Sequence, residues 1–207
     1  MIWSWIDACV GFVALHPSWA LGVVFAAAII EAVAVIGIVI PGTPILMAVT
    51  GAAAAAGQPM WPFLLLAITG AVIGDFLSFW FGARYAATLR TIWPFSRWPD
   101  MIGRADWFFE KYGVASVALC RFVPVLRSTV PLVAGMAGMR RRQFVLANVA
   151  SAFVWAPAHV YPAQFAGLML DALRQGNWIA VSIWAGMLAA CLVGAFVLHR
   201  LVVVRAR

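Results

Sequence analysis

Long apolar runs constrain the fold of this chain more than any other feature. The main runs cover residues 21–40, 61–83, 143–170 and 178–204. A helix needs about 20 mostly apolar residues to cross a bilayer, and inside the hydrocarbon its backbone polar groups must pair within the segment. Of the 207 residues, 65% are hydrophobic and only 10% are charged, whereas soluble proteins average about 25% charged residues. The sequence therefore predicts an all-α, polytopic integral membrane protein, with residues 1–207 forming a single membrane domain.

The first apolar run ends at a helix-breaking sequence. Residues 41–44 read Pro-Gly-Thr-Pro, and a second run of small residues follows at 45–57. Two prolines beside a glycine interrupt a helix. At about 1.5 Å per residue the run 45–57 reaches only about 20 Å, less than a hydrocarbon core of about 30 Å. We therefore expect residues 21–57 to form a re-entrant helical hairpin rather than two full spans.

The same pattern recurs in the second half of the chain. Residues 114–139 are apolar but are broken between Pro124 and Pro131, so a second re-entrant hairpin is predicted there. The residues expected at the two hairpin tips are Pro41, Gly42 and Thr43 in the first hairpin, and Pro124 and Pro131 in the second.

Basic residues mark one side of the predicted membrane. They gather in residues 84–111, in residues 140–142 and at the C-terminus, which by the positive-inside bias would face the cytoplasm. Residues 1–18 carry tryptophans and are expected to lie at the interface. The runs 61–83, 143–170 and 178–204 then supply about three spanning helices, the last of them C-terminal.

With this orientation, the two hairpins enter from opposite sides as an inverted repeat, an architecture that recurs in transporters. If residues 21–40 instead crossed the membrane, the N-terminus would lie inside.

Two arginines lie inside the second apolar stretch. Arg121 and Arg127 flank Pro124, although an arginine at the middle of a membrane helix costs about 2.5 to 3.5 kcal/mol on insertion scales. A guanidinium keeps its charge and offers a fork of donors that matches a phosphate group. A half-helix that starts after Pro124 or Pro131 would add free backbone N–H groups. The pair Arg121 and Arg127 is therefore predicted to bind phosphate.

Two carboxylates are the counterparts of these arginines. Glu31 lies in the first apolar run, and Asp75 lies in the first spanning run, residues 61–83. Phosphate and Glu31 could compete for the same cations, which makes Glu31 a candidate proton switch. Alternatively, Glu31 and Asp75 neutralise the arginines in static buried pairs that hold the hairpins together. The two roles can coexist, and for Asp75 we favour the structural one.

Several other classes of function are disfavoured. The net charge is +7, but the basic residues lie in short connections rather than on one soluble face, so no nucleic-acid partner is expected. The sequence shows no paired nucleophile and base and no Gly-rich phosphate loop followed by lysine, so no enzyme activity is expected. We also expect no cofactor and no metal, because the cysteines lack metal-ligand spacing. They are Cys9, Cys120 and Cys191.

An ordered set of residues carries a family resemblance. Its members are Glu31, Pro41 and Gly42; Gly74, Asp75, Phe79, Trp80 and Gly82; the stretch 108–113; Arg121, Phe122, Pro124, Arg127, Val130, Pro131, Ala134 and Gly135; and Met139, Phe144, Asn148 and Trp155. Over residues 20–160 the chain resembles the DedA family of bacterial membrane proteins, also called the SNARE-associated or VTT domain family.

The resemblance implies a multi-pass protein of the bacterial cytoplasmic (inner) membrane that flips a lipid-linked phosphate, such as undecaprenyl phosphate, with proton coupling. In the family, function depends on the residues that match Glu31, Arg121 and Arg127. Many bacterial relatives have an acidic residue where this chain has Thr43. That departure leaves Glu31 as the one carboxylate of the first hairpin for proton coupling.

Other functions remain open at the level of the sequence. The chain could be a general phospholipid scramblase, a proton-dependent transporter of ions or osmolytes, or a structural scaffold of the membrane. Its partner is expected to be a lipid with a phosphate headgroup. The faces rich in glycine and alanine leave room for a homodimer.

Overall fold

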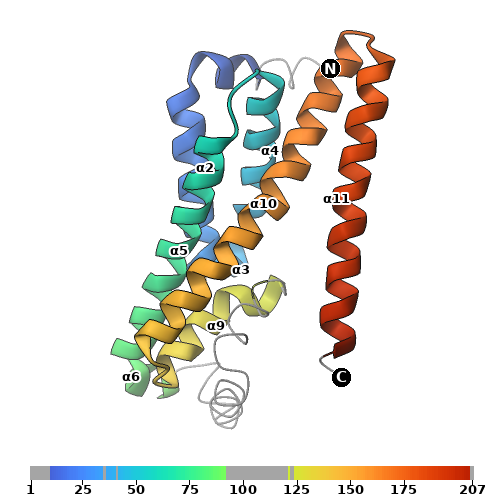
Figure 1. Ribbon diagram of the computed structural model, residues 1–207. Helices are drawn as coiled ribbons and strands as arrows, with labels where there is room; N and C mark the ends of the chain where they lie inside the picture. Colours follow the sequence, from blue (N-terminus) through green and yellow to red (C-terminus); the bar gives the residue numbers. More distant parts are fainter. Residues whose placement is uncertain (1–9, 35, 41, 92–120, 122–123, 206–207) are drawn as a thin grey trace. The chain divides into compact units, whose positions relative to one another are not determined.

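The described chain is helical in the computed structural model, which describes residues 10–34, 36–40, 42–91, 121 and 124–205 (Figure 1). No strand occurs among these residues, as the predicted all-α class requires. The helices are α2 (Pro17–Ala32), α3 (Ile36–Val39), α4 (Gly42–Ala55), α5 (Trp61–Arg84), α6 (Ala86–Thr91), α9 (Pro124–Met136), α10 (Arg141–Arg174) and α11 (Trp178–Arg205).

The described part of the first predicted hairpin consists of three helices. Helix α2 ends at Ala32, and the four-residue α3 follows before α4 begins at Gly42. Thr43 and Pro44 therefore lie in the first turn of α4, where a proline costs no hydrogen bond because the first N–H groups have no intrahelical partner. Pro41 lies outside the described residues.

In the second predicted hairpin, α9 starts at Pro124 and continues through Pro131. The break expected between Pro124 and Pro131 is therefore absent, because these residues form one continuous helix. A proline inside a helix removes one backbone hydrogen bond, but packing against neighbouring residues can retain the helical path. The first arm of this hairpin lies outside the described residues, apart from Arg121. So do residues 1–9 of the interfacial segment and residues 92–111 of the first group of basic residues.

Three of the long apolar runs, 61–83, 143–170 and 178–204, form long helices. Helices α5 and α10 have 24 and 34 residues, and both are long and apolar enough to cross a membrane. Helix α11 counts as a shorter apolar helix in the part that ends at Gly194, but its backbone is helical for 28 residues. At about 1.5 Å per residue, 28 residues extend about 42 Å.

The chain separates into two compact units. One comprises the described residues up to Ala27, Thr43–Ala67 and everything from Ala156 onward, and within it α4 approaches α10 closely. A side chain at Gly167 would overlap the backbone carbonyl of Gly51. The other unit comprises the described parts of Ala28–Gly42 and Ile68–Trp155, and its core includes Phe79, Ala134, Phe144 and Ala147. All four charged residues singled out in the sequence belong to this second unit.

Candidate functional site

The site begins where the end of α2 meets α5. A Cβ atom added to Gly74 would lie 2.6 Å from the carbonyl oxygen of Ile29 and 2.7 Å from the Cβ of Ala32. Only a glycine permits this approach. It brings Glu31, in the last turn of α2, into the same core as Asp75, which follows Gly74 on α5, and both carboxylate side chains are buried.

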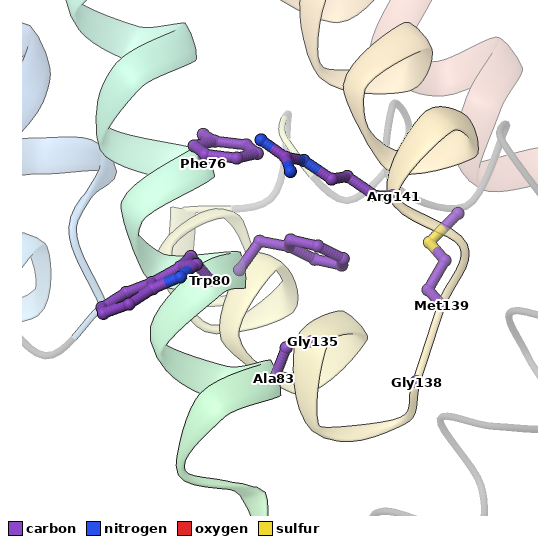
Figure 2. A pocket seen from close by; sticks show the side chains of 8 residues that line it. Phe76, Trp80, Ala83, Gly135, Gly138, Met139 and Arg141 are labelled. Carbon is purple, nitrogen blue, oxygen red and sulfur yellow. The ribbon is translucent and has the colours of Figure 1, made fainter.

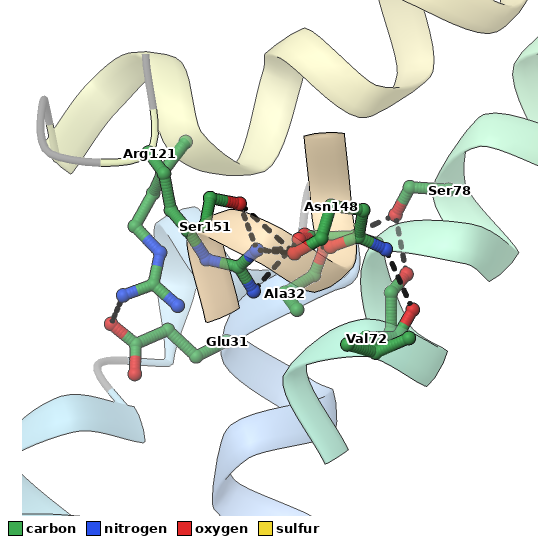
Figure 3. Close-up of polar contacts among 10 residues, drawn as sticks. Glu31, Ala32, Val72, Ser78, Arg121, Asn148 and Ser151 are labelled. Carbon is green, nitrogen blue, oxygen red and sulfur yellow. Dashed lines mark hydrogen bonds and ion pairs between the residues drawn. The ribbon is translucent and has the colours of Figure 1, made fainter. Parts of the chain in front are cut away.

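Arg127 pairs with Glu31. Its Nη1 donates a hydrogen bond to Oε1 of Glu31 over 2.6 Å, and the two side chains are only 9% and 10% exposed. Figure 3 marks the bond that Glu31 accepts. Burial of both charges is expensive unless they neutralise each other, so this contact accounts for the presence of each in an apolar core.

Arg121 pairs with Asp75 and is also anchored to α10. Its Nη2 lies 2.9 Å from Oδ2 of Asp75, which makes the contact an ion pair. Its Nη1 donates to Oδ1 and the backbone carbonyl of Asn148, over 2.9 and 3.1 Å, and to Oγ of Ser151 over 2.9 Å (Figure 3). Asn148 in turn donates to the carbonyl of Val72 over 3.0 Å. Arg121 is therefore held by a network that ties α10 to α5.

Trp155 contacts both arginines. The guanidinium carbon lies 4.7 Å from the ring centroid for Arg127 and 5.7 Å for Arg121, and the indole is 1% exposed. A cation over a desolvated tryptophan ring is stabilised by about 2 kcal/mol. This stabilisation does not require a carboxylate, so it persists when the partner of an arginine changes.

Ser78 secures the helix break beside Glu31. Its Oγ accepts a hydrogen bond from the backbone N–H of Ala34 over 2.8 Å. The same hydroxyl lies 3.2 and 3.1 Å from the carbonyl oxygens of Ala32 and Gly74, to which it can donate. Ser78 on α5 thus provides hydrogen-bond partners for backbone groups that have no helical partner at the end of α2.

Four of the predicted site residues therefore lie in one core, in the pairs Arg127–Glu31 and Arg121–Asp75. The formal charges of the four side chains cancel. The predicted tip residues have other positions: Gly42 and Thr43 start α4, Pro124 starts α9 and Pro131 lies within it. Where the structure is described, no group of three or more His, Cys, Asp or Glu residues could hold a metal ion.

The sequence did not single out Ser78 or Ser151. Asn148 and Trp155 appeared there only as part of the family pattern. The sequence did contain a signal for these residues in their helical spacing. Asn148, Ser151 and Trp155 are spaced by three and four residues, which places them on one face of α10, and Asp75 and Ser78 share a face of α5 in the same way. Polar residues at helical spacing in an apolar helix are a signature of a buried polar network.

Comparison with known proteins identifies a family. Residues 40–165 match the VTT domain. The inner membrane protein YabI of Escherichia coli K12 is 29% identical over 186 residues, which cover 84% of this chain and 72% of YabI. Protein DedA of the same organism is 29% identical over 164 residues, 75% of this chain and 72% of DedA. The membrane protein Mb2670 of Mycobacterium bovis is 32% identical over 133 residues, 61% of each chain.

No solved structure matches the chain. The VTT domain match covers more than half of the 207 residues and includes Asp75, Arg121 and Arg127. The similarity to YabI and DedA covers most of the chain. This chain therefore belongs to the VTT domain family, the DedA family of membrane proteins.

Proposed function

We propose that this membrane protein is a multi-pass transporter of the bacterial cytoplasmic membrane that flips a lipid-linked phosphate of the undecaprenyl phosphate type. The observation that carries the proposal is the pairing of Arg127 with Glu31 in a buried core beside a second, anchored arginine. The relative YabI is an inner membrane protein by name, which supports the location.

Arg127 is the arginine that we assign to exchange with substrate. A phosphate oxygen carries the same kind of charge as the carboxylate of Glu31 and suits the same guanidinium. Arg121 has a different role in the proposal, because three acceptors on α10 and the carboxylate of Asp75 hold it. We assign to Arg121 a constant positive charge beside the phosphate, and to Arg127 the contact that forms and breaks.

The charge count supports proton coupling. Two arginines and two carboxylates are neutral together, so a bound phosphate would leave the core with a net negative charge. A buried net charge is costly, and protonation of Glu31 would remove one negative charge as the phosphate takes its place on Arg127. Asp75 supplies a second carboxylate in this core, although Thr43 replaces the acidic residue that many relatives carry after the Pro-Gly pair.

Helix length supports the re-entrant topology in the proposal. Helix α4 has 14 residues and α9 has 13, so each extends only about 20 Å at 1.5 Å per residue, against a hydrocarbon core of about 30 Å. Short helices with polar residues at their breaks are the usual setting of substrate sites in transporters built from inverted repeats. We place the groups of basic residues in the connections and at the C-terminus on the cytoplasmic side.

The proposal is tested by reconstitution. Purified protein is incorporated into vesicles that contain a fluorescent polyprenyl phosphate in both leaflets, and dithionite then quenches the outer-leaflet label. We expect the protein to expose the inner-leaflet label, and Arg127→Gln to abolish this exchange. Arg84→Gln is the matched control, because Arg84 is exposed at the end of α5.

Parallel vesicles with fluorescent phosphatidylcholine separate the alternatives. Equal exchange of both lipids would replace the flippase by a general scramblase. Exchange of neither lipid, by protein that elutes as a single folded species, would favour a scaffold without transport.

A further inference from the structure

The described part of the chain has a surface cleft that lies away from the buried arginine pairs. Helix α5 supplies a wall of aromatic side chains, Phe76, Phe79 and Trp80, and the connection from α9 to α10 supplies Met139 and Arg141. Together they line a cleft of about 350 Å³ (Figure 2). This volume lies at the lower end of the range of about 300 to 1,000 Å³ that is typical of ligand sites.

The cleft has a rigid frame. A side chain at Gly82 would overlap the carbonyl of Leu132, and one at Gly135 would overlap the carbonyl of Phe79, so α5 and α9 are in direct backbone contact. The ring of Phe79 stacks on that of Phe144, with centroids 4.2 Å apart and an interplanar angle of 13°. These contacts fix the backbone of α5 against α9 and the ring of Phe79 in the aromatic wall.

The residues at the mouth of the cleft are of the kinds expected at the level of lipid headgroups. Arg140, Arg141 and Arg142 are consecutive and exposed. Each would cost about 2.5 to 3.5 kcal/mol at the centre of the hydrocarbon, so we expect this turn at the boundary of the membrane. Trp80, on the opposite wall, is 52% exposed, and tryptophan is enriched at that same boundary.

The two parts of the cleft have complementary chemistry. The guanidinium carbon of Arg141 lies 4.9 Å from the ring centroid of Phe76, which places the cation at the edge of an apolar wall (Figure 2). A guanidinium fork suits a phosphodiester, and an aromatic wall suits an acyl chain. The first turn of α10 contains no acidic residue that would repel an anion.

We propose that this cleft binds an anionic glycerophospholipid of the surrounding leaflet. The phosphate binds Arg141, and the upper part of an acyl chain lies along Phe76 and Trp80. This site is separate from the pairs Arg127–Glu31 and Arg121–Asp75, and it does not rest on the proposed transport. It would hold a lipid of the bilayer whether or not the protein moves another one.

The test measures lipid binding directly. The purified full chain is titrated in detergent with short-chain phosphatidylglycerol or phosphatidylcholine, and native mass spectrometry counts the bound lipids. We expect wild type to bind phosphatidylglycerol more tightly than phosphatidylcholine. Arg141→Gln should weaken phosphatidylglycerol binding about tenfold, since one charge-assisted hydrogen bond contributes about 1.5 kcal/mol.

Arg142→Gln is the matched control, because it removes the same charge from the same turn but from a residue that does not line the cleft. It should bind phosphatidylglycerol as wild type does. Trp80→Ala should weaken the binding of both lipids, because it shortens the apolar wall. Inorganic phosphate at millimolar concentration should not displace the lipid if the acyl chain contributes.

Equal losses in Arg141→Gln and Arg142→Gln would overturn the site in favour of diffuse attraction to basic residues. Unchanged binding in Arg141→Gln would also overturn it. Each variant should elute as wild type does in size-exclusion chromatography, which separates a lost site from a lost fold.

Discussion

Nη1 of Arg127 lies 2.6 Å from Oε1 of Glu31, although the two residues are 96 positions apart in the chain. This contact joins α9 to the last turn of α2 inside one compact unit. Because both side chains are buried, neither charge can be removed without an effect on the other. The contact is therefore the natural point at which to test whether these residues stabilise the fold, exchange with substrate, or do both.

The first prediction concerns the coupling of this pair. Arg127→Gln should lower the free energy of unfolding by about 3 to 5 kcal/mol, because Glu31 is left as a buried charge without its cation. The double variant Glu31→Gln with Arg127→Gln should recover about 1 to 3 kcal/mol of that loss. Unfolding by SDS in mixed micelles measures both quantities, and strictly additive losses would show that the pair does not interact.

A second prediction separates the two arginines. Arg121→Gln should cost more stability than Arg127→Gln, because it also removes hydrogen bonds to Asn148 and Ser151, each of them charge-assisted and contributing about 1.5 to 3 kcal/mol. Thermal unfolding, monitored by size-exclusion chromatography of heated samples, gives the order of stability of the two variants. The reverse order would mean that Arg121 is not the anchored cation.

Trp155 provides a third test. Trp155→Leu should lower stability by about 3 to 5 kcal/mol, because it removes buried ring volume and the cation contacts of both arginines. Trp155→Phe keeps a ring face and should lose less. In the transport assay, Trp155→Phe should retain exchange of polyprenyl phosphate with a raised KM. If the two variants were equally impaired, the ring face would have no role beyond filling space.

Ser78 offers a fourth, purely structural test. Ser78→Ala leaves the N–H of Ala34 without the acceptor that it has in the structure, and should cost about 1 to 3 kcal/mol of stability. Ser182→Ala is the control, since Ser182 is exposed and its hydroxyl bonds only a carbonyl of its own helix among the contacts described. Its effect should stay within about 0.5 kcal/mol. Equal stability of the two variants in the SDS assay would show that Ser78 does not stabilise the helix break after α2.

The fifth prediction concerns protons. If Glu31 takes up a proton as phosphate binds Arg127, wild-type exchange should change with the pH difference across the vesicle membrane. Glu31→Gln should lose this dependence, because glutamine cannot take up the proton. Dithionite quenching at a series of internal and external pH values measures it. An unchanged pH response of Glu31→Gln would assign the coupling to another group, and Asp75→Asn is the next variant to test.

Much of the architecture follows from local patterns in the sequence. Apolar runs of sufficient length predicted α5 and α10, and the helix starts at Gly42 and Pro124 follow from the proline-containing breaks. The position of Pro131 inside α9 did not follow, because packing can stabilise a helix through a proline whose local effect is to break it. The early end of α2 at Ala32 also depends on a non-local contact, the hydrogen bond between Ser78 and Ala34.

The sequence by itself determined that this chain is a helical membrane protein and that two arginines and two carboxylates lie where charge is costly. It could do so because hydrophobic length and the cost of a buried charge are local properties. Only the tertiary structure decided that Arg127 faces Glu31 while Arg121 faces Asp75, Asn148 and Ser151. The pairing depends on how α2, α5, α9 and α10 approach one another, which glycine contacts such as that of Gly74 permit but no residue spacing specifies.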